Sequence, residues 1–109
     1  MVKKSMILGR EVSDEVPPYI IAEISANHNG DLENTFKIID MAKRCGADAV
    51  KMQTYTPDTI TLNSAKEDFV IKDGLWKGRT LHQLYEWAHT PWEWHAEMFE
   101  YAKDIGITL

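Results

Sequence analysis

Residues 19–53, YIIAEISANHNGDLENTFKIIDMAKRCGADAVKMQ, decide the fold. The stretch 19–25 is mostly apolar and β-branched, which is typical of a strand buried on both faces. After the polar loop 26–30, an apolar stripe at spacings of four and three residues predicts a helix. A second short strand is predicted at residues 49–53. A strand, a helix and a strand joined by such short loops form a βαβ unit, which implies a parallel sheet.

The helix between these strands has clear end signals. Asp31 is a good N-cap, because its carboxylate can accept hydrogen bonds from the free amides of the first turn. The apolar stripe consists of Leu32, Phe36 and Ile39. The helix is expected to end at Cys45-Gly46, since glycine readily takes the left-handed conformation that closes helices.

Residues 54–79 show no clear period and are punctuated by Pro57, Gly74 and Gly78. We expect a long irregular segment here, and loops longer than about 12–15 residues in compact domains are usually functional. A short amphipathic helix follows at residues 81–88, where the apolar positions share one face.

A last helix is predicted to start with Thr90 as N-cap and Pro91 in the first helical position. Its apolar face is formed by Trp94, Met98, Tyr101 and Ile105. Gly106 closes it, and residues 107–109 begin a third strand.

The predicted elements are too few to complete an α/β domain. A buried parallel sheet needs helices on both faces, which two helical layers with two strands and the start of a third cannot supply. Residues 6–12 add one further short strand, separated from the rest by Pro17 and Pro18. We therefore expect residues 1–109 to be the amino-terminal portion of a larger α/β protein.

The composition is that of an ordinary globular chain of 109 residues with a net charge of −5. The acidic balance argues against nucleic acid or an anionic membrane surface as partner. A single cysteine excludes an internal disulfide framework and suits a reducing compartment. No stretch approaches the roughly 18 apolar residues of a membrane span, so a cytoplasmic location is expected.

Polar residues share one face of the two predicted strands. Because side chains alternate along a strand, Glu23 lies opposite the aliphatic residues of the first strand, as Lys51 and Gln53 do on the second. Ligands of α/β proteins bind at the carboxyl ends of such strands. Two interpretations stay open. Glu23 and Lys51 either form a structural pair, or Lys51 holds an anionic substrate group while Glu23 acts on a proton or hydroxyl.

The loop after the first strand, Asn27-His28-Asn29-Gly30, precedes a helix amino terminus, where backbone amides attract anions. His28 is a candidate acid, base or substrate hydrogen-bonder, although a simple turn explains the asparagines and glycine equally well. The other histidines do not have zinc-ligand spacing, and solvated or capping roles are expected for His82, His89 and His95.

Residues 21–30 (IAEISANHNG) and 46–54 (GADAVKMQT) together resemble the start of the sialic acid synthase family. Residues 54–59, 74–81 and 90–95 resemble its pseudaminic acid synthase branch most. The family condenses phosphoenolpyruvate with an amino sugar to form nine-carbon acids.

The resemblance implies an α/β fold, a (β/α)8 TIM barrel followed by a small antifreeze-like domain, in a homodimer. This chain would supply the leading hairpin, the first two strands with their helices and the start of the third. A divalent metal, Mn²⁺ or Mg²⁺, is implied, with its ligands on later strands outside this chain. The isolated chain is therefore expected to be inactive.

By the same similarity, Lys51 binds phosphoenolpyruvate, and Glu23 and Gln53 contact the sugar near its reacting carbon. Glu23 is the catalytic candidate, by proton transfer or by orienting a hydroxyl. Asn27, His28 and Tyr55 complete the expected substrate-binding set, and sugar discrimination is expected within residues 55–79.

The implied reaction joins phosphoenolpyruvate to 2,4-diacetamido-2,4,6-trideoxy-L-altrose, giving pseudaminic acid and phosphate by C–O cleavage, a transferase reaction of class EC 2.5.1. Two alternatives remain open. One is a synthase of N-acetylneuraminic or legionaminic acid, which would use a different amino sugar. The other is a non-catalytic binding or assembly module.

Overall fold

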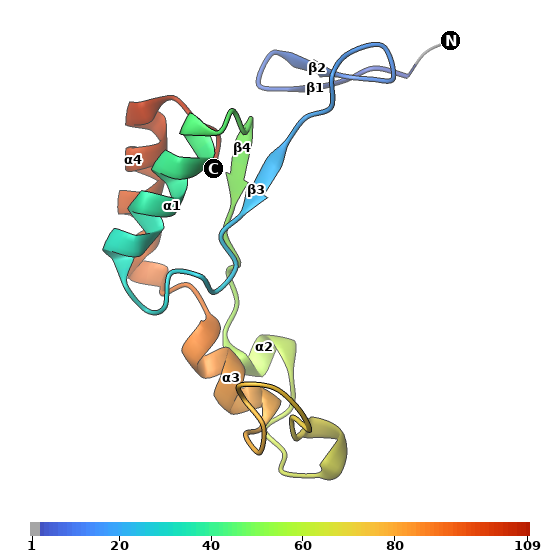
Figure 1. Ribbon diagram of the computed structural model, residues 1–109, viewed down its shortest axis with the longest axis vertical. Helices are drawn as coiled ribbons and strands as arrows, with labels where there is room; N and C mark the ends of the chain where they lie inside the picture. Colours follow the sequence, from blue (N-terminus) through green and yellow to red (C-terminus); the bar gives the residue numbers. More distant parts are fainter. Residues whose placement is uncertain (1–2) are drawn as a thin grey trace.

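The computed structural model describes residues 3–109, so residues 1 and 2 of the expected portion lie outside it. Its centre is a parallel pair of strands, β3 (Ile21–Glu23) and β4 (Ala49–Lys51), connected by the helix α1 (Leu32–Arg44) (Figure 1). The predicted βαβ unit is therefore confirmed, although both strands are shorter than expected.

The ends of α1 are the predicted ones. The Asp31 carboxylate accepts a hydrogen bond from the Glu33 backbone amide at 2.9 Å. Gly46 follows the helix with φ of 85°, in the left-handed region. Ile39, the last residue of the predicted stripe, is fully buried. The stripe and both end signals were therefore interpreted correctly.

A third strand begins where it was predicted. Thr108 pairs with Ala49 in parallel, and its carbonyl accepts a hydrogen bond of 2.8 Å from the Val50 amide. The helix α4 (His95–Ile105) precedes it and ends at Gly106, whose φ is 76°. The order in the sheet is thus β3, β4 and then the segment at Thr108.

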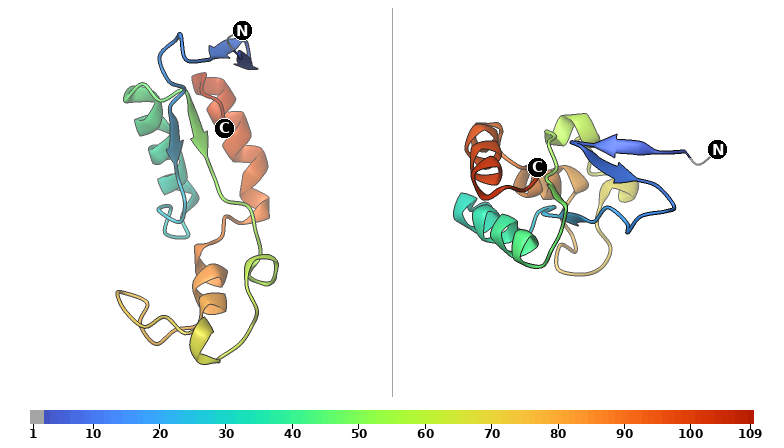
Figure 2. Two further views of the ribbon diagram at one scale, coloured as in Figure 1. Left: turned by 90° about the vertical axis from the view of Figure 1, so that its right-hand side faces the viewer. Right: turned by 90° about the horizontal axis from the view of Figure 1, so that it is seen from above.

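Helices α1 and α4 lie on the same side of the strands (Figures 1 and 2). The core between them and the sheet is apolar and consists of Ile24, Ile39, Ala42, Val50, Met98, Ala102 and Ile107. The expectation that the first strand is buried on both faces is wrong for this chain, because Ile20 and Ile21 are each 51% exposed. No described helix covers the face of β3 opposite α1 and α4 (Figures 1 and 2).

The start of the last helix differs from the prediction. Pro91 has ψ of 137°, so it lies outside any helix, and a 3₁₀ turn, η2 (Trp92–Trp94), leads into α4. The Thr90 hydroxyl is buried and makes no hydrogen bond within residues 3–109, so Thr90 does not act as a cap. Met98 on the predicted apolar face is fully buried, as expected.

The leading segment forms a hairpin, β1 (Ser5–Ile7) and β2 (Arg10–Val12), where residue patterning alone had predicted one strand. Leu8 and Gly9 at its turn both have positive φ, 46° and 84°, as a tight hairpin turn requires. Arg10 connects the hairpin to the sheet through an ion pair with Asp48. Asp48 also accepts a 2.7 Å hydrogen bond from the Ile20 amide at the start of the first strand segment.

Residues 55–90 extend away from the sheet, and we call them the arm. It contains α2 (Pro57–Ile60), the 3₁₀ turn η1 (Glu67–Phe69) and α3 (Leu81–Ala88). The expected irregular segment is therefore partly helical, because Pro57 provides the first residue of a short helix. The prediction of α3 is confirmed. The arm lies at the carboxyl ends of β3 and β4, and the hairpin lies at their amino ends (Figures 1 and 2).

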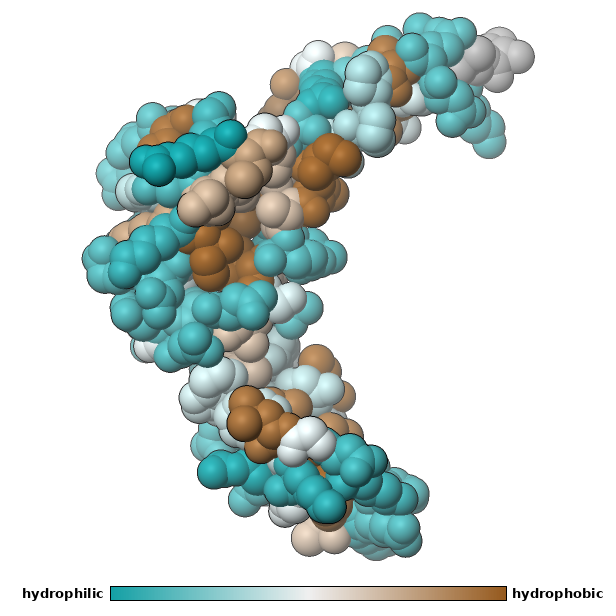
Figure 3. Space-filling model, in the orientation of Figure 1, coloured by the Kyte–Doolittle hydropathy of each residue, from teal (hydrophilic) through white to brown (hydrophobic). Residues whose placement is uncertain are grey.

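The molecule is elongated, with extents of 49 × 37 × 23 Å and a radius of gyration of 17.3 Å, against about 13 Å for a closed domain of this length. Apolar side chains reach the surface in several places along it (Figure 3). Among residues 3–109 no helix has the length and apolar character needed to cross a membrane.

Candidate active site

Glu23 and Lys51 are direct partners in the register of β3 and β4. Their side chains form an ion pair on the sheet face away from the core, with 43% of the Glu23 side chain and 59% of the Lys51 side chain exposed. The two residues that strand alternation placed together are therefore in contact. The pair is accessible to an anion or a sugar hydroxyl, so the structure is compatible with both interpretations of it.

Gln53 follows Lys51 two residues later, is exposed and lies beyond the last ladder residue of β4. Tyr55 comes next on the same segment and packs edge-on against Tyr85 of α3, with ring centroids 5.6 Å apart. Burial raises the pKa of the Tyr55 phenol, and the neighbouring Tyr85 adds to the effect. Tyr55 is thus a neutral phenol at the base of the arm.

The loop from Ile24 to Gly30 is tightly folded. Ser25 and Asn29 have φ values of 49° and 51°, which non-glycine residues rarely adopt. The Asn27 side-chain amide donates a 3.0 Å hydrogen bond to the Ile24 carbonyl, and the side chain remains exposed. Asn27 therefore stays available to a ligand at the carboxyl end of β3.

His28 is enclosed by protein, with 1% of the residue exposed. Its Nδ1 accepts a 3.0 Å hydrogen bond from the Gly30 amide, so the proton of the neutral ring is on Nε2. Its ring meets Trp94 edge-on at 5.2 Å. Burial lowers the pKa of His28, and His89 lowers it further. This position favours the turn role of His28 over direct contact with a substrate.

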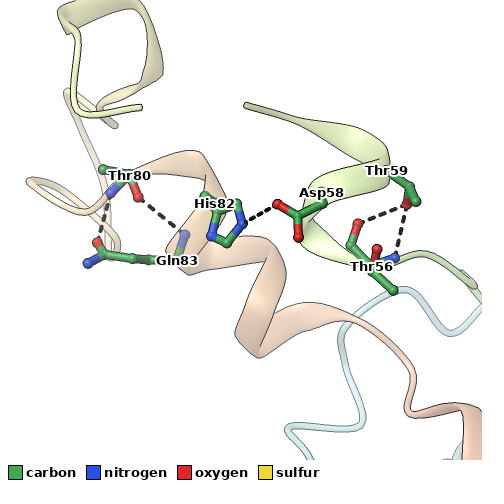
Figure 4. Close-up of polar contacts among 6 residues, drawn as sticks. All are labelled: Thr56, Asp58, Thr59, Thr80, His82 and Gln83. Atoms are coloured by element: carbon green, nitrogen blue, oxygen red, sulfur yellow. Dashed lines mark hydrogen bonds and ion pairs between the residues drawn. The ribbon is translucent and has the colours of Figure 1, made fainter. Parts of the chain in front are cut away.

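The remaining histidines make polar contacts within the chain, and for His82 the expected solvated or capping role is wrong, because its side chain is 16% exposed and faces another helix. His82 Nε2 lies 3.0 Å from the Asp58 carboxylate, and this contact connects α3 to α2 (Figure 4). Each of the two helices also has a hydrogen bond at its first turn, between Thr56 and Thr59 in α2 and between Thr80 and Gln83 in α3. His89 Nδ1 donates to the Glu86 carbonyl at 2.7 Å.

His95 makes a contact that no sequence pattern indicated. Its Nε2 lies 2.7 Å from the Thr54 hydroxyl, 41 residues earlier in the chain.

A family model described as the NeuB family matches residues 38–109, about two thirds of the chain. The chain belongs to the NeuB family. It is 62% identical over 89 residues to a pseudaminic acid synthase of Campylobacter jejuni, an alignment that covers 82% of this chain and 26% of that protein. It is 52% identical over 93 residues to a pseudaminic acid synthase of Helicobacter pylori, covering 84% of this chain and 27% of that protein.

One solved structure shares the fold of this NeuB-family chain. It is the N-acetylneuraminic acid synthetase of Leptospira borgpetersenii in complex with citrate, with a TM-score of 0.75 and 23% identity. The match covers 98% of this chain and 33% of that one. The chain thus spans about a quarter of the length of the curated relatives and a third of the structural neighbour.

The part of this NeuB-family chain that the structure describes contains no group of three or more His, Cys, Asp or Glu side chains placed to hold a metal ion. Residues 3–109 therefore do not form a metal site by themselves. Glu23 and Lys51 are the charged groups that the fold brings together at the carboxyl ends of the strands.

Proposed function

We propose that this chain is the amino-terminal portion of the (β/α)8 barrel of a pseudaminic acid synthase. The observation that carries the proposal is the accessible Glu23–Lys51 pair, in register on two parallel strands and on the face away from the helices. In α/β barrels that face lines the interior, and the carboxyl ends of the strands form the active site. The similarity to two pseudaminic acid synthases supports the choice of reaction.

In this proposal Lys51 binds phosphoenolpyruvate. Its ammonium is a compact charge on a flexible stem, which suits a phosphate or carboxylate group. Glu23 holds the ammonium on the exposed face in the absence of substrate. An incoming anion then replaces the carboxylate as partner of Lys51, which leaves Glu23 free to interact with the second substrate.

The second substrate is 2,4-diacetamido-2,4,6-trideoxy-L-altrose in its open-chain form. Carbon 3 of phosphoenolpyruvate attacks the aldehyde carbon, which forms the new C–C bond and leaves an electron-deficient carbon 2. The aldehyde oxygen takes up a proton. Water adds to carbon 2 and loses a proton, which leaves a hydroxyl on a tetrahedral carbon 2. The bond from carbon 2 to the phosphate oxygen then breaks as this hydroxyl loses its proton, and the departing phosphate takes the proton up. The products are inorganic phosphate and the 2-keto form of pseudaminic acid.

Glu23 has two possible roles in this sequence, and both are consistent with its position. As a general acid or base it would move the proton at the aldehyde oxygen or at the attacking water. As an orienting group it would accept a hydrogen bond from a sugar hydroxyl. Gln53 and Asn27 are exposed near the same strand ends and complete the sugar contacts.

The rest of the proposal concerns the complete protein. It includes a divalent metal, Mn²⁺ or Mg²⁺, whose ligands lie outside this chain and which would polarise the aldehyde. It also includes a homodimer, a cytoplasmic location and a requirement for the later strands, so that the isolated chain is inactive. Residues 55–79 of the arm are where we expect the sugar to be selected, because the arm lies at the carboxyl ends of the strands.

A panel of sugars tests the proposal. The full-length protein is incubated with phosphoenolpyruvate, Mn²⁺ and one of three sugars, and phosphate release is followed. Release with the diacetamido-trideoxy-altrose sugar alone is the expected result. Release with an N-acetylmannosamine-type or legionaminic-type sugar instead would retain the chemistry and overturn the choice of sugar. Absence of release with every sugar would favour the non-catalytic module.

A further inference from the structure

The segment that leaves β4 is irregular but anchored at one side chain. Regular strand pairing ends at Lys51, and residues 52–56 belong to no helix or strand. The Thr54 hydroxyl, in the middle of this segment, lies 2.7 Å from Nε2 of His95. His95 is the first residue of α4. The contact therefore connects the exit of β4 to the start of the helix that packs against the core.

The tautomer of His95 follows from its other nitrogen. Nδ1 lies 3.1 Å from the Pro91 carbonyl oxygen and 3.0 Å from the Trp92 carbonyl oxygen. Carbonyl oxygens only accept hydrogen bonds, so Nδ1 carries a proton and donates to them. In the neutral ring Nε2 is consequently an acceptor, and the Thr54 hydroxyl donates to it.

The plane of the His95 ring is also defined. It stacks on the indole of Trp92, with centroids 5.2 Å apart and an angle of 21° between the planes. The ring is thus held by the Trp92 indole, by carbonyls at Nδ1 and by a hydroxyl at Nε2. A surface histidine with a purely solvated role would not need three such partners.

Thr54 and His95 stand on either side of the arm. One precedes it and the other follows it, so their hydrogen bond closes its base across 41 residues. Tyr55 adds a second contact at the same base through Tyr85. The hydrogen bond therefore restricts the path of the backbone at Gln53. It also restricts the angle at which the arm leaves the sheet.

From this geometry we infer that His95, through the Thr54 hydroxyl, is a positioning residue that fixes Gln53 and the base of the arm for binding of the sugar. The inference rests on the proposed function, because it assigns a purpose to residues of the same site. His95 touches no reacting atom in this account and acts only through Thr54.

The test uses the full-length protein and three variants, Thr54→Val, Thr54→Ser and His95→Asn. Valine has the shape of threonine without the hydroxyl, and serine keeps the hydroxyl as the matched control. Asparagine retains a donor near the Pro91 and Trp92 carbonyls but does not reach Thr54. The measurements are kcat and KM for the sugar, KM for phosphoenolpyruvate, the Tm, and amide hydrogen exchange at residues 52–56.

We expect Thr54→Val and His95→Asn each to lower kcat/KM for the sugar about five- to tenfold, as the loss of one neutral hydrogen bond implies. In both variants KM for phosphoenolpyruvate and Tm should stay near the wild-type values, and amide exchange at residues 52–56 should become faster. Thr54→Ser should keep the wild-type kcat/KM for the sugar and the wild-type exchange. Combining the two changes should cost no more than either alone, since they remove one interaction.

Wild-type kinetics together with wild-type exchange in both variants would overturn the inference, and so would a loss of Tm that accounts for the loss of activity. The exchange measurement needs no substrate. If the wild-type protein released no phosphate with any sugar, the proposed function would fail, and faster exchange confined to residues 52–56 would still show that His95 positions this segment.

Discussion

Glu23 and Lys51 occupy the same register position on adjacent parallel strands, and their side chains are paired on the face of the sheet away from α1 and α4. Both side chains are substantially exposed, and ion pairs of this kind contribute about 0–1 kcal/mol to stability. An anion that displaces Glu23 from Lys51 therefore loses little binding free energy to the breaking of the ion pair. Separating the two side chains therefore costs little free energy, which suits a binding site more than a structural ion pair of the core.

Replacing Lys51 by alanine separates binding from folding. We expect Lys51→Ala to weaken phosphoenolpyruvate binding by roughly 10- to 100-fold, because a charge-assisted contact is lost. The Tm should change by no more than a few degrees, because the pair lies at the carboxyl ends of the strands, where the active site of the proposed barrel is open to solvent. Lys4→Ala is the matched control, since Lys4 forms an exposed ion pair with Glu11 in the hairpin, at the opposite end of the strands. Loss of folding in Lys51→Ala would instead support the non-catalytic module.

Replacing Glu23 by glutamine distinguishes its two roles. Glutamine keeps the shape and the hydrogen-bonding capacity but does not titrate. If Glu23 transfers a proton, kcat should fall about 10²- to 10⁴-fold and the corresponding limb of the pH profile of kcat should disappear. If it orients a hydroxyl, the main effect should be a higher KM for the sugar with the pH profile retained. Wild-type kcat and KM in Glu23→Gln would remove Glu23 from the site.

The hydrogen bond that Asp48 accepts from the Ile20 amide should contribute more to stability than its ion pair with Arg10. Asp48→Asn loses the charge opposite Arg10 but can still accept the hydrogen bond from the Ile20 amide. We expect it to cost about 0–1 kcal/mol in the free energy of unfolding. Asp48→Ala leaves that amide without its acceptor and should cost a further ~1–3 kcal/mol. Urea denaturation of the two variants measures the difference, and equal costs would contradict the assigned role of the hydrogen bond.

His28 should make stability depend on pH. Unfolded His28 binds a proton with the usual pKa of 6.5, whereas burial lowers the pKa of the folded ring. Between the two values the unfolded state holds more protons, so stability falls as the pH is lowered from about 6.5 towards the folded pKa. His28→Asn keeps an acceptor for the Gly30 amide and does not titrate. The Tm of His28→Asn should therefore fall less than that of the wild type as the pH is lowered below about 6.5. Identical plots of Tm against pH for the two proteins would refute the prediction.

The sequence carries the βαβ unit because that unit depends on local signals. The stripe through Ile39, the Asp31 cap and the terminal Gly46 are each readable within a few residues and agree with one another. Strand alternation was enough to bring Glu23 and Lys51 together, since register and period fix the face of every residue in a parallel pair.

Features that depend on distant segments could not be predicted in the same way. The burial of His28 is partly due to its contact with Trp94, which comes after the arm in the sequence. The Thr54–His95 hydrogen bond needs the whole path of the arm to bring its partners together. The start of α4 was misplaced because Thr90 and Pro91 fit a helix start by residue type, while the backbone at Pro91 stays extended.

The most direct test of the central claim is phosphate release by the full-length protein with phosphoenolpyruvate, Mn²⁺ and 2,4-diacetamido-2,4,6-trideoxy-L-altrose. It is measured for the wild type, Lys51→Ala and the control Lys4→Ala. The account predicts release by the wild type and the control, and a strong loss at subsaturating phosphoenolpyruvate in Lys51→Ala with little change in Tm. Equal rates in all three proteins, or no release by the wild type, would contradict it.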